Sequence, residues 1–427
     1  MAAVAPLLDE ADARAREAAD PSRRSDFMIP PWPGPDGGEW AYFAGNSLGL
    51  QPLAAAAAVE QELAAWGELA VEGWFEGAAP WLAASDELRP SLARLAGADA
   101  EEVVAMNTLT VNLHLMLATF YRPAGERFRI VVEDAAFPSD SHAVASHARR
   151  HGLDPAAAIV RLKPREGEAA LRTEDVVTEL ERLRGGVALV LLGGVNYLTG
   201  ELFAIPEITA AAHDIGAIAA WDLAHAIGNV PLALAEWDVD WAVWCHYKYV
   251  NAGPGAPGGA FVAARHGRDH DLPRLAGWWG TDPAERFLME PDFVPRAGAA
   301  GWEVSTPTVL ALAPLRASLE LFDAVGMPAL RARSLRLTAY LEALLDDVVR
   351  ARRAEVTTPR DASRRGCQLS LAVPDARMLA ARLRADHGVI CDVREPDIVR
   401  FAPVPLSSSY HDCWRAAAGL RDLLPAR

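Results

Sequence analysis

Short apolar runs alternate with amphipathic helical patterns from about residue 100 to 265, and this alternation constrains the fold more than any other feature of the chain. The helical patterns include TEDVVTELERL (173–183) and IPEITAAAHDIG (205–216). Continuously apolar strands separated by helices are typical of a parallel sheet covered on both faces. We therefore predict an α/β fold with a large domain, in which helices flank a mainly parallel seven-stranded sheet. The seven predicted strands lie in the runs EEVVAM, RIVVED, AAIVRL, VALVLLGG, GAIAAWD, WAVWC and GAFVAA.

The pattern changes past residue 308, where long helices are followed by GCQLSLAV (366–373), a helix near 375–386 and the strands GVICDV and DIVRFA. This order predicts a smaller α+β C-terminal domain. Near the N-terminus, PPWPGPDGG (30–38) cannot lie inside a helix, because proline lacks the amide N–H and glycine costs backbone entropy. We predict an N-terminal helix with this Pro/Gly-rich segment over 1–40, the large domain over 41–310 and the small domain over 311–427.

Composition excludes several classes of partner. The 427 residues carry a net charge of −16, which repels nucleic acid and anionic membranes. The longest apolar stretch, VALVLLGGV, is too short to cross a bilayer, and Asp9 and Glu10 interrupt any signal-peptide pattern, so we expect a cytoplasmic protein. The four cysteines show no CxxC spacing, which supports neither a disulfide framework nor a zinc site.

An aspartate and a lysine follow two neighbouring strands of the predicted sheet. Asp222 ends the apolar run GAIAAWD, and Lys248 comes after WAVWC, 26 residues later. Ligands of open α/β sheets bind outside the carboxyl ends of the strands. Pyridoxal 5'-phosphate needs a carboxylate for its ring nitrogen and an amine for a Schiff base, and this pair supplies both. Taken singly, Asp222 could be a helix N-cap and Lys248 a solvated charge.

The glycine-rich run after the lysine is a false dinucleotide signal. GPGAPG (253–258) matches GxGxxG, but two prolines interrupt it and the following GAFVAA is a predicted strand rather than a helix. We interpret it as a turn-forming loop beside the site.

Two predicted helix starts are candidate phosphate sites, because a helix N-terminus offers free N–H groups to an anion. Thr108 and Thr110 precede one helical run, and Ser139 and Asp140 open another after the turn at Phe137 and Pro138. Plain N-caps are the alternative interpretation of these residues.

Eight blocks together resemble the kynureninase family, over about residues 42–415. They are YFAGNSLGLQP, NTLTVNLHLML, AFPSDSHA, VNYLTGELF, DLAHAIGNVPL, CHYKYVNAGPG, LAGWWG and VRFAPVPL. The resemblance implies an enzyme of pyridoxal-phosphate fold type I, similar to aspartate aminotransferase, whose large domain binds the cofactor. It implies hydrolysis of L-kynurenine to anthranilate and L-alanine, with cleavage of the Cβ–Cγ bond, and a place in tryptophan catabolism.

The resemblance also implies residue roles. Lys248 would form the Schiff base and take the Cα proton, Tyr247 would be a proton donor, and Asp222 would pair with the ring nitrogen. Trp278 and Thr306 would reach the cofactor of a neighbouring subunit, so a homodimer is implied. The implied cofactor-binding set is Leu109, Thr110, Phe137, Pro138, Ser139, Asp140, Asp222, His225, Tyr247, Lys248, Trp278 and Thr306. The implied substrate-binding set is Arg400, which would clamp the α-carboxylate, with Trp74, Asn46 and Ser47.

The chain departs from some family members at particular positions. Gly193 stands where many carry a Ser or Thr near the phosphate. Trp74, Thr281 and Thr306 stand where the animal enzymes, which favour 3-hydroxykynurenine, have His, His and Asn. Trp74 and Thr306 resemble the bacterial members, which predicts a preference for unhydroxylated kynurenine.

Two alternatives stay open at the level of sequence. One is another reaction on the same scaffold, such as that of a cysteine desulfurase or an aminotransferase. A desulfurase needs a mobile nucleophilic cysteine, whereas Cys367, Cys391 and Cys413 lie in or beside predicted regular elements and Cys245 lies at a strand end. The other is a binding protein that has kept the fold and lost activity. The joint presence of Lys248, Asp222 and Arg400 argues against it.

Overall fold

The computed structural model describes residues 9–34 and 37–426. Residues 1–8, which begin the predicted N-terminal segment, and residues 35–36, within the Pro/Gly-rich run, lie outside the described residues, as does residue 427. None of the helices in the described ranges is both long enough and apolar enough to span a membrane.

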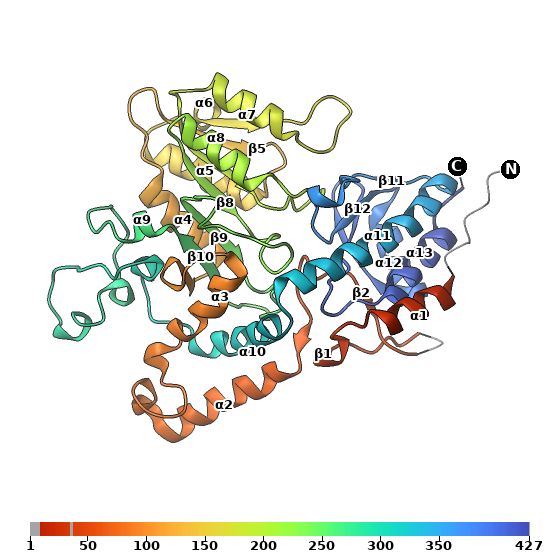
Figure 1. Cartoon of the computed structure of the whole chain (residues 1–427), viewed down its shortest axis with the longest axis horizontal. Coiled ribbons are helices and arrows are strands. Elements are labelled where there is room, and N and C mark those ends of the chain that lie inside the picture. Colours follow the sequence, from red (N-terminus) through yellow and green to blue (C-terminus); the bar gives the residue numbers. More distant parts are fainter. Residues whose placement is uncertain (1–8, 35–36, 427) are drawn as a thin grey trace.

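A sheet of seven strands forms the centre of the larger part of the described chain, in the order β4-β10-β9-β8-β7-β5-β6 (Figure 1). All pairs are parallel except those of β10, which runs antiparallel to both neighbours. Each strand lies in a predicted apolar run, except that β10 begins one residue before its run, so the mainly parallel sheet is confirmed. The strands are β4 (Val103–Met106), β5 (Arg129–Glu133), β6 (Ile159–Leu162), β7 (Val187–Gly193), β8 (Ile218–Asp222), β9 (Trp241–Cys245) and β10 (Gly258–Val262).

Helices cover both faces of this sheet and create two separate cores. Along β7, Val190 and Leu192 enter one core, whereas Leu189 and Leu191 enter the other, as the two-residue period of a strand requires. This two-sided burial explains why the strands read as unbroken apolar runs. The helices associated with this sheet are α3 (Arg89–Ala96), α4 (Leu109–Phe120), α5 (Pro138–Arg150), α6 (Pro155–Ala158), α7 (Thr173–Arg182), α8 (Ile205–Asp214) and α9 (Ala264–Gly267).

The C-terminal elements surround a third core. An antiparallel sheet of order β11-β12-β15-β14 is made of β11 (Glu355–Val356), β12 (Leu369–Ala372), β14 (Asp392–Arg394) and β15 (Ile398–Phe401). It packs with α11 (Met327–Ala351), α12 (Ala376–His387) and α13 (Tyr410–Leu423), and forms the blue part of Figure 1. The predicted α+β character of this region is confirmed.

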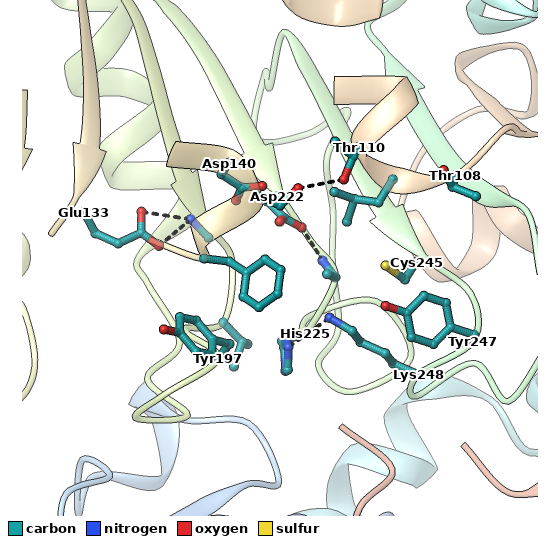
Figure 2. Close-up of a pocket in the computed structure, with 16 residues that line it drawn as sticks. Thr108, Thr110, Glu133, Asp140, Tyr197, Asp222, His225, Cys245, Tyr247 and Lys248 are labelled. Carbon is teal, nitrogen blue, oxygen red and sulfur yellow. Dashed lines mark hydrogen bonds between the residues drawn. The ribbon is translucent and has the colours of Figure 1, made fainter. Parts of the chain in front are cut away.

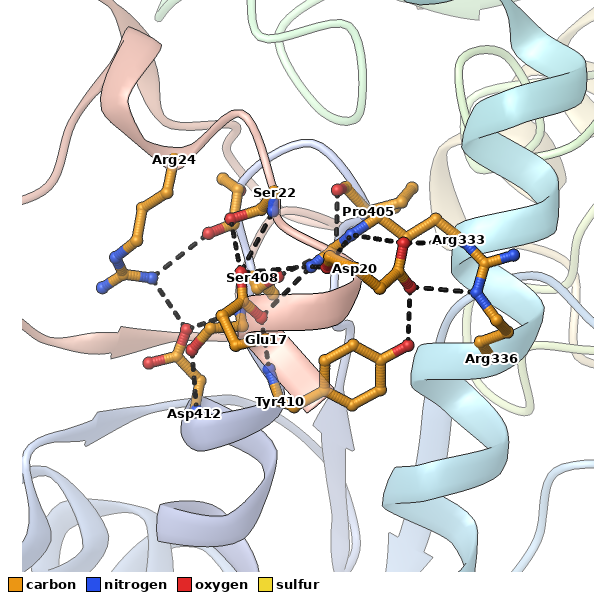
Figure 3. Close-up of polar contacts among 12 residues, drawn as sticks. Glu17, Asp20, Ser22, Arg24, Arg333, Arg336, Pro405, Ser408, Tyr410 and Asp412 are labelled. Atoms are coloured by element: carbon orange, nitrogen blue, oxygen red, sulfur yellow. Dashed lines mark hydrogen bonds and ion pairs between the residues drawn. The ribbon is translucent and has the colours of Figure 1, made fainter. Parts of the chain in front are cut away.

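The N-terminal elements join these C-terminal ones. Helix α1 (Glu10–Ala19) packs on α13, and β2 (Ala41–Tyr42) pairs with β13 (Val389–Ile390). Figure 3 shows the polar contacts that hold this junction: Arg333 of α11 donates to the carbonyls of Pro405 and Ser408 and pairs with Glu17. Asp20 accepts hydrogen bonds from Arg336 and from the hydroxyl of Tyr410. The start and the end of the chain are therefore tied together.

Two helices far apart in sequence lie side by side below the large sheet. Helix α2 (Ala54–Leu69) packs along α10 (Val309–Val325), and α10 contributes Leu312, Leu315 and Leu319 to a core of the large sheet. Strands β1 (Phe27–Met28) and β3 (Gln51–Pro52) pair beside them. The predicted domain boundaries at 40 and 310 stay predictions; the packing groups α1 and β2 with the C-terminal core, and α10 with the large sheet.

Candidate active site

A pocket of about 150 Å³ opens where the carboxyl ends of several sheet strands meet the starts of two helices (Figure 2). Glu133, Gly193, Asp222 and Cys245 are the last residues of β5, β7, β8 and β9, and all four line it. This is the edge at which open α/β sheets bind ligands. The parallel strands thus bring together residues that are up to 112 positions apart in sequence.

Lys248 lies in this pocket and is buried. Its Nζ is 3.1 Å from Nε2 of His225 and 5.8 Å from the ring centroids of both Phe137 and Tyr247. The sequence contains one other lysine, Lys163, which is exposed just after the end of β6 and does not line the pocket. Because the side chain of Lys248 is buried and contacts His225, its alternative interpretation as an ordinary solvated charge is wrong.

Two aspartates face the pocket from β8 and α5. Burial raises the pKa of Asp222, whose Oδ1 accepts the backbone N–H of Ala224 at 2.8 Å. Burial, together with the neighbouring Asp222, raises the pKa of Asp140 well above its usual range. Oδ1 of Asp140 has no hydrogen-bond partner within the part of the chain that is described. Two carboxyl groups that are close together and lack enough hydrogen-bond donors are stabilised by sharing one proton. They are also stabilised by accepting a hydrogen bond from a positively charged N–H group.

Glu133 is a pocket residue that sequence reasoning missed. Its carboxylate accepts the backbone N–H of Gly193, with distances of 3.1 and 3.3 Å to its two oxygens, and burial raises its pKa to about 7. A Cβ atom at position 193 would lie 3.0 Å from Oε1 of Glu133. The glycine that departs from the family pattern therefore leaves room for this carboxyl group. The available signal was its position at the end of RIVVE, four residues before the predicted turn at Phe137.

His225 and Tyr197 form the side of the pocket next to Lys248. Burial, with Lys248 nearby, lowers the pKa of His225 well below its usual range, so the imidazole is neutral. The Tyr197 ring packs edge-on against Phe137, with centroids 5.3 Å apart, and lies 6.5 Å from the ring of His225. Tyr197 was also missed from sequence, although it follows β7 in VNYLTG.

Helices α4 and α5 both begin at the pocket, and neither has a side-chain cap at its N-terminus. Thr108 occupies the N-cap position of α4, as the alternative interpretation expects, but its hydroxyl makes no capping hydrogen bond. Thr110 and Ser139 instead hydrogen-bond to each other across the two helices, at 2.8 Å between their oxygens. Two uncapped helix starts with two hydroxyls form a site suited to a phosphate dianion.

Tyr247 and Cys245 line the remaining wall. Burial raises the pKa of both groups, that of Cys245 to about 11, so the phenol and the thiol are both protonated near neutral pH. Beyond them, Gly253 and Gly255 adopt positive φ values of +85° and +78° in the loop before β10. A strand follows this loop, which confirms that the GxGxxG match is not a dinucleotide site.

Several predicted site residues lie outside this pocket. Pro138 occupies the first turn of α5 without lining the cavity. Trp278 is exposed against Phe287 and Trp279. Arg400 is fully buried and bonds to Ser47, next to the buried Asn46. These roles stay predictions.

Trp74 and Thr306 line a second cavity of about 640 Å³, which we call the α2 groove. Its walls are mainly apolar and include exposed side chains such as Trp66, Val71 and Leu310. The residues that line it are Glu62, Trp66, Ala70, Val71, Trp74, Trp81, Thr306, Pro307, Thr308, Val309, Leu310 and Ala311. Neither Trp74 nor Thr306 reaches the Lys248 pocket of the same chain.

Solved structures share this fold. The apo structure of a cysteine desulfurase from Thermococcus onnurineus matches with a TM-score of 0.74 at 18% identity, covering 90% of this chain and 94% of that one. A cystine C–S lyase in complex with its product cysteine persulfide gives a TM-score of 0.75 at 20% identity, covering 90% and 98%. At these identities the likeness establishes the fold, which is the predicted fold type I.

Sequence comparisons go further. A family model described as the kynureninase C-terminal domain matches residues 330–420. A kynureninase of Salinispora tropica is 57% identical over 419 residues, covering 97% of each chain. A kynureninase of Koribacter versatilis is 52% identical, covering 93% of this chain and 94% of that one, and one of Myxococcus xanthus is 52% identical, covering 95% of each. With half or more of its residues shared over nearly its whole length, the chain belongs to the kynureninase family.

Proposed function

We propose that this protein hydrolyses L-kynurenine to anthranilate and L-alanine, with pyridoxal 5'-phosphate as its cofactor, and that 3-hydroxy-L-kynurenine is a poorer substrate. The observation that carries the proposal is the buried amine of Lys248, set in one pocket with Asp222 and two uncapped helix starts. Membership of the kynureninase family supports the choice of reaction.

The pocket fits the cofactor at three places. The starts of α4 and α5, with Leu109, Thr110 and Ser139, would hold the phosphate. Asp222 would accept a hydrogen bond from the protonated ring nitrogen. Oδ1 of Asp140, which has no partner among the described residues, would accept a hydrogen bond from a second donor nearby. Phe137 would pack against the ring, with His225 beside it. When bound there, the cofactor supplies an electron sink for the substrate's α-carbon.

The chain's own groups would move the protons. Lys248 is placed to take the proton from the substrate's Cα, and the neutral His225 beside it adds no competing positive charge. Water adds to the γ-carbonyl, the Cβ–Cγ bond breaks, and anthranilate leaves with the carbonyl carbon as its carboxylate. Tyr247, whose raised pKa keeps the phenol protonated, would deliver the proton to the alanine carbon. Arg400 would bind the α-carboxylate.

We further propose a homodimer with a site shared between subunits. The α2 groove carries exposed large apolar side chains, including Trp66, Val71 and Leu310, and Trp278 is exposed on a neighbouring segment. An apolar surface of this kind marks an interaction site in a folded protein. A cytoplasmic location is proposed with it, supported by four cysteines that are all free.

A desulfurase activity is disfavoured by the cysteine that lies nearest to the chemistry. Cys245 lines the pocket, yet burial raises its pKa to about 11, which keeps it as the unreactive thiol. The alternatives of an aminotransferase or a non-catalytic binding protein gain no observation in their favour.

The proposal is tested by supplying the pyridoxal-phosphate-loaded protein with L-kynurenine and measuring anthranilate fluorescence and L-alanine together. We expect equal amounts of the two products, and a higher kcat/KM for L-kynurenine than for its 3-hydroxy analogue. A protein that binds the cofactor and forms neither product would disprove the proposed reaction, whereas a strong preference for the 3-hydroxy compound would reject only the substrate order.

A further inference from the structure

Arg400, the proposed carboxylate clamp, already holds a carboxylate of its own chain. Its Nη2 donates to Oδ2 of Asp392 at 2.6 Å and to the hydroxyl of Ser47 at 3.1 Å, and its Nη1 donates to the carbonyl of Tyr197 at 2.5 Å. Its Nε–H has no partner among the described residues, although the side chain is fully buried. A buried donor without an acceptor is costly, which points to a ligand at this edge of the guanidinium.

Asp392 is shared between two arginines. In the antiparallel pair of β14 and β15 it lies directly opposite Arg400, so their side chains are neighbours on one face. Its second oxygen, Oδ1, accepts a bond from Arg394, which is also on β14 and is partly exposed. The Ser47 hydroxyl donates to Asp392 and accepts from both guanidinium groups.

This cluster is joined to the wall of the Lys248 pocket through Tyr197. The carbonyl that accepts from Arg400 belongs to Tyr197, which lines the Lys248 pocket. After burial and Lys248, the charges of Arg400 and Arg394 are the causes that lower the pKa of His225, the partner of Lys248. An amino acid bound at Lys248 would therefore present its α-carboxylate toward these guanidinium groups.

We propose that Asp392 is an exchangeable internal ligand: it holds Arg400 until the substrate's α-carboxylate takes the Nε and Nη2 edge, and Arg394 then retains Asp392. The inference rests on the proposed function and deepens it, since it assigns Asp392 and Arg394 as positioning residues for carboxylate recognition.

The arrangement keeps the exchange inexpensive. Arg400 is always charged, so without an anion it would be a buried unpaired cation. Asp392 supplies that anion in the free enzyme. When the substrate arrives, Asp392 loses one of two arginine partners and keeps the other, so its own charge is not left unpaired. Asp392 competes with any incoming carboxylate for Arg400. A ligand that does not also bind at Lys248 therefore has a lower affinity for the site.

The test compares L-alanine with L-alaninamide, which lacks the carboxylate, as ligands of the pyridoxal-phosphate-loaded enzyme, by calorimetric titration. In Asp392→Asn, which keeps the shape and removes the competing charge, we expect L-alanine to bind about tenfold more tightly. In Arg394→Met, where Asp392 has Arg400 as its remaining arginine, we expect L-alanine to bind about tenfold more weakly. Binding of L-alaninamide should change little in either variant, and kcat should move less than KM.

The matched control is Arg377→Met, which removes an exposed arginine that pairs with Glu395 near the same strands. It should leave both ligands unchanged. Weaker binding of L-alanine to Asp392→Asn would overturn the exchange and make Asp392 a permanent support of Arg400. If Asp392→Asn does not fold, unchanged L-alanine affinity in Arg394→Met would overturn the proposal equally. Failure of the wild-type enzyme to bind either ligand would instead count against the proposed function.

Discussion

The Lys248 pocket and the α2 groove differ in almost every physical respect. The pocket is small and built largely from strand ends inside one chain, and its lining combines one amine with the buried carboxyl groups of Asp222, Asp140 and Glu133. The groove is about four times larger, apolar and lined by exposed rings such as Trp66. Proton chemistry needs groups held rigidly with perturbed acidity, whereas an apolar surface is stabilised by whatever covers it. We infer that the first region sets the reaction and that the second sets assembly and substrate preference.

The sharpest way to break this division is to remove the amine. Lys248→Ala should lower turnover by at least about 10²–10⁴-fold while leaving the melting temperature nearly unchanged, because the group that moves the proton is lost. Anthranilate formation and thermal unfolding measure the two quantities. Lys163→Ala is a matched control, since it removes the other lysine of the sequence, and it should be silent. Near-normal turnover in Lys248→Ala would contradict the assignment of the chemistry to the pocket.

A charge in the α2 groove should affect assembly first and turnover as a consequence. Leu310→Glu should raise the dimer dissociation constant by about 30-fold, which corresponds to ~2 kcal/mol, because it buries an unpaired carboxylate in an apolar interface. Sedimentation velocity over a range of concentrations measures this. Met378→Glu is the control, since Met378 is an exposed apolar residue on α12, away from the groove. A Leu310→Glu protein that assembles and turns over normally would remove the groove from the account.

Trp74 sharpens the comparison on the side of substrate preference. Trp74→His introduces the residue of the animal enzymes and should move the ratio of kcat/KM for L-kynurenine over 3-hydroxy-L-kynurenine by about tenfold toward the hydroxylated substrate, because an imidazole can bond to the hydroxyl. The comparison of both substrates in one preparation cancels errors in enzyme concentration. An unchanged ratio would mean that ring recognition lies elsewhere.

The smallest expected effect concerns stability inside the pocket. Burial raises the pKa of Glu133 from 4.5 to about 7, so between these pH values the folded protein retains a proton that the unfolded chain has lost. Glu133 therefore lowers stability progressively as the pH rises through this window. Glu133→Gln should melt higher than the wild type by roughly 2–4 °C above pH 7, and the difference should shrink toward pH 4.5. A difference independent of pH would show that Glu133 is charged throughout.

Much of the pocket could be predicted from sequence, because its main residues end strands that are recognisable as apolar runs. Asp222 and Lys248 were found in this way. Glu133 could not be predicted, because its contact with Gly193 depends on β5 lying next to β7. No single apolar run indicates the order of the strands in a sheet.

In the small domain, too, contacts between different elements could not be predicted from sequence. Asp392 meets Arg400 through the register of β14 and β15, and β14 was predicted only as part of one strand, GVICDV, which the structure divides between two sheets. The α2 groove was reached from sequence solely through the family resemblance, because its walls come from α2 and α10, which are about 250 residues apart. Local patterns thus predicted elements and strand-end residues, while contacts between distant elements required the fold.

The central claim is that Lys248 alone carries the cofactor, and one measurement tests it directly. The protein is loaded with pyridoxal 5'-phosphate, reduced with sodium borohydride, digested and mapped by mass spectrometry. The account predicts the pyridoxyl-phosphate mass on the peptide that contains Lys248 and none on the peptide that contains Lys163. Label on Lys163, or on neither peptide of a protein that has bound the cofactor, would contradict it.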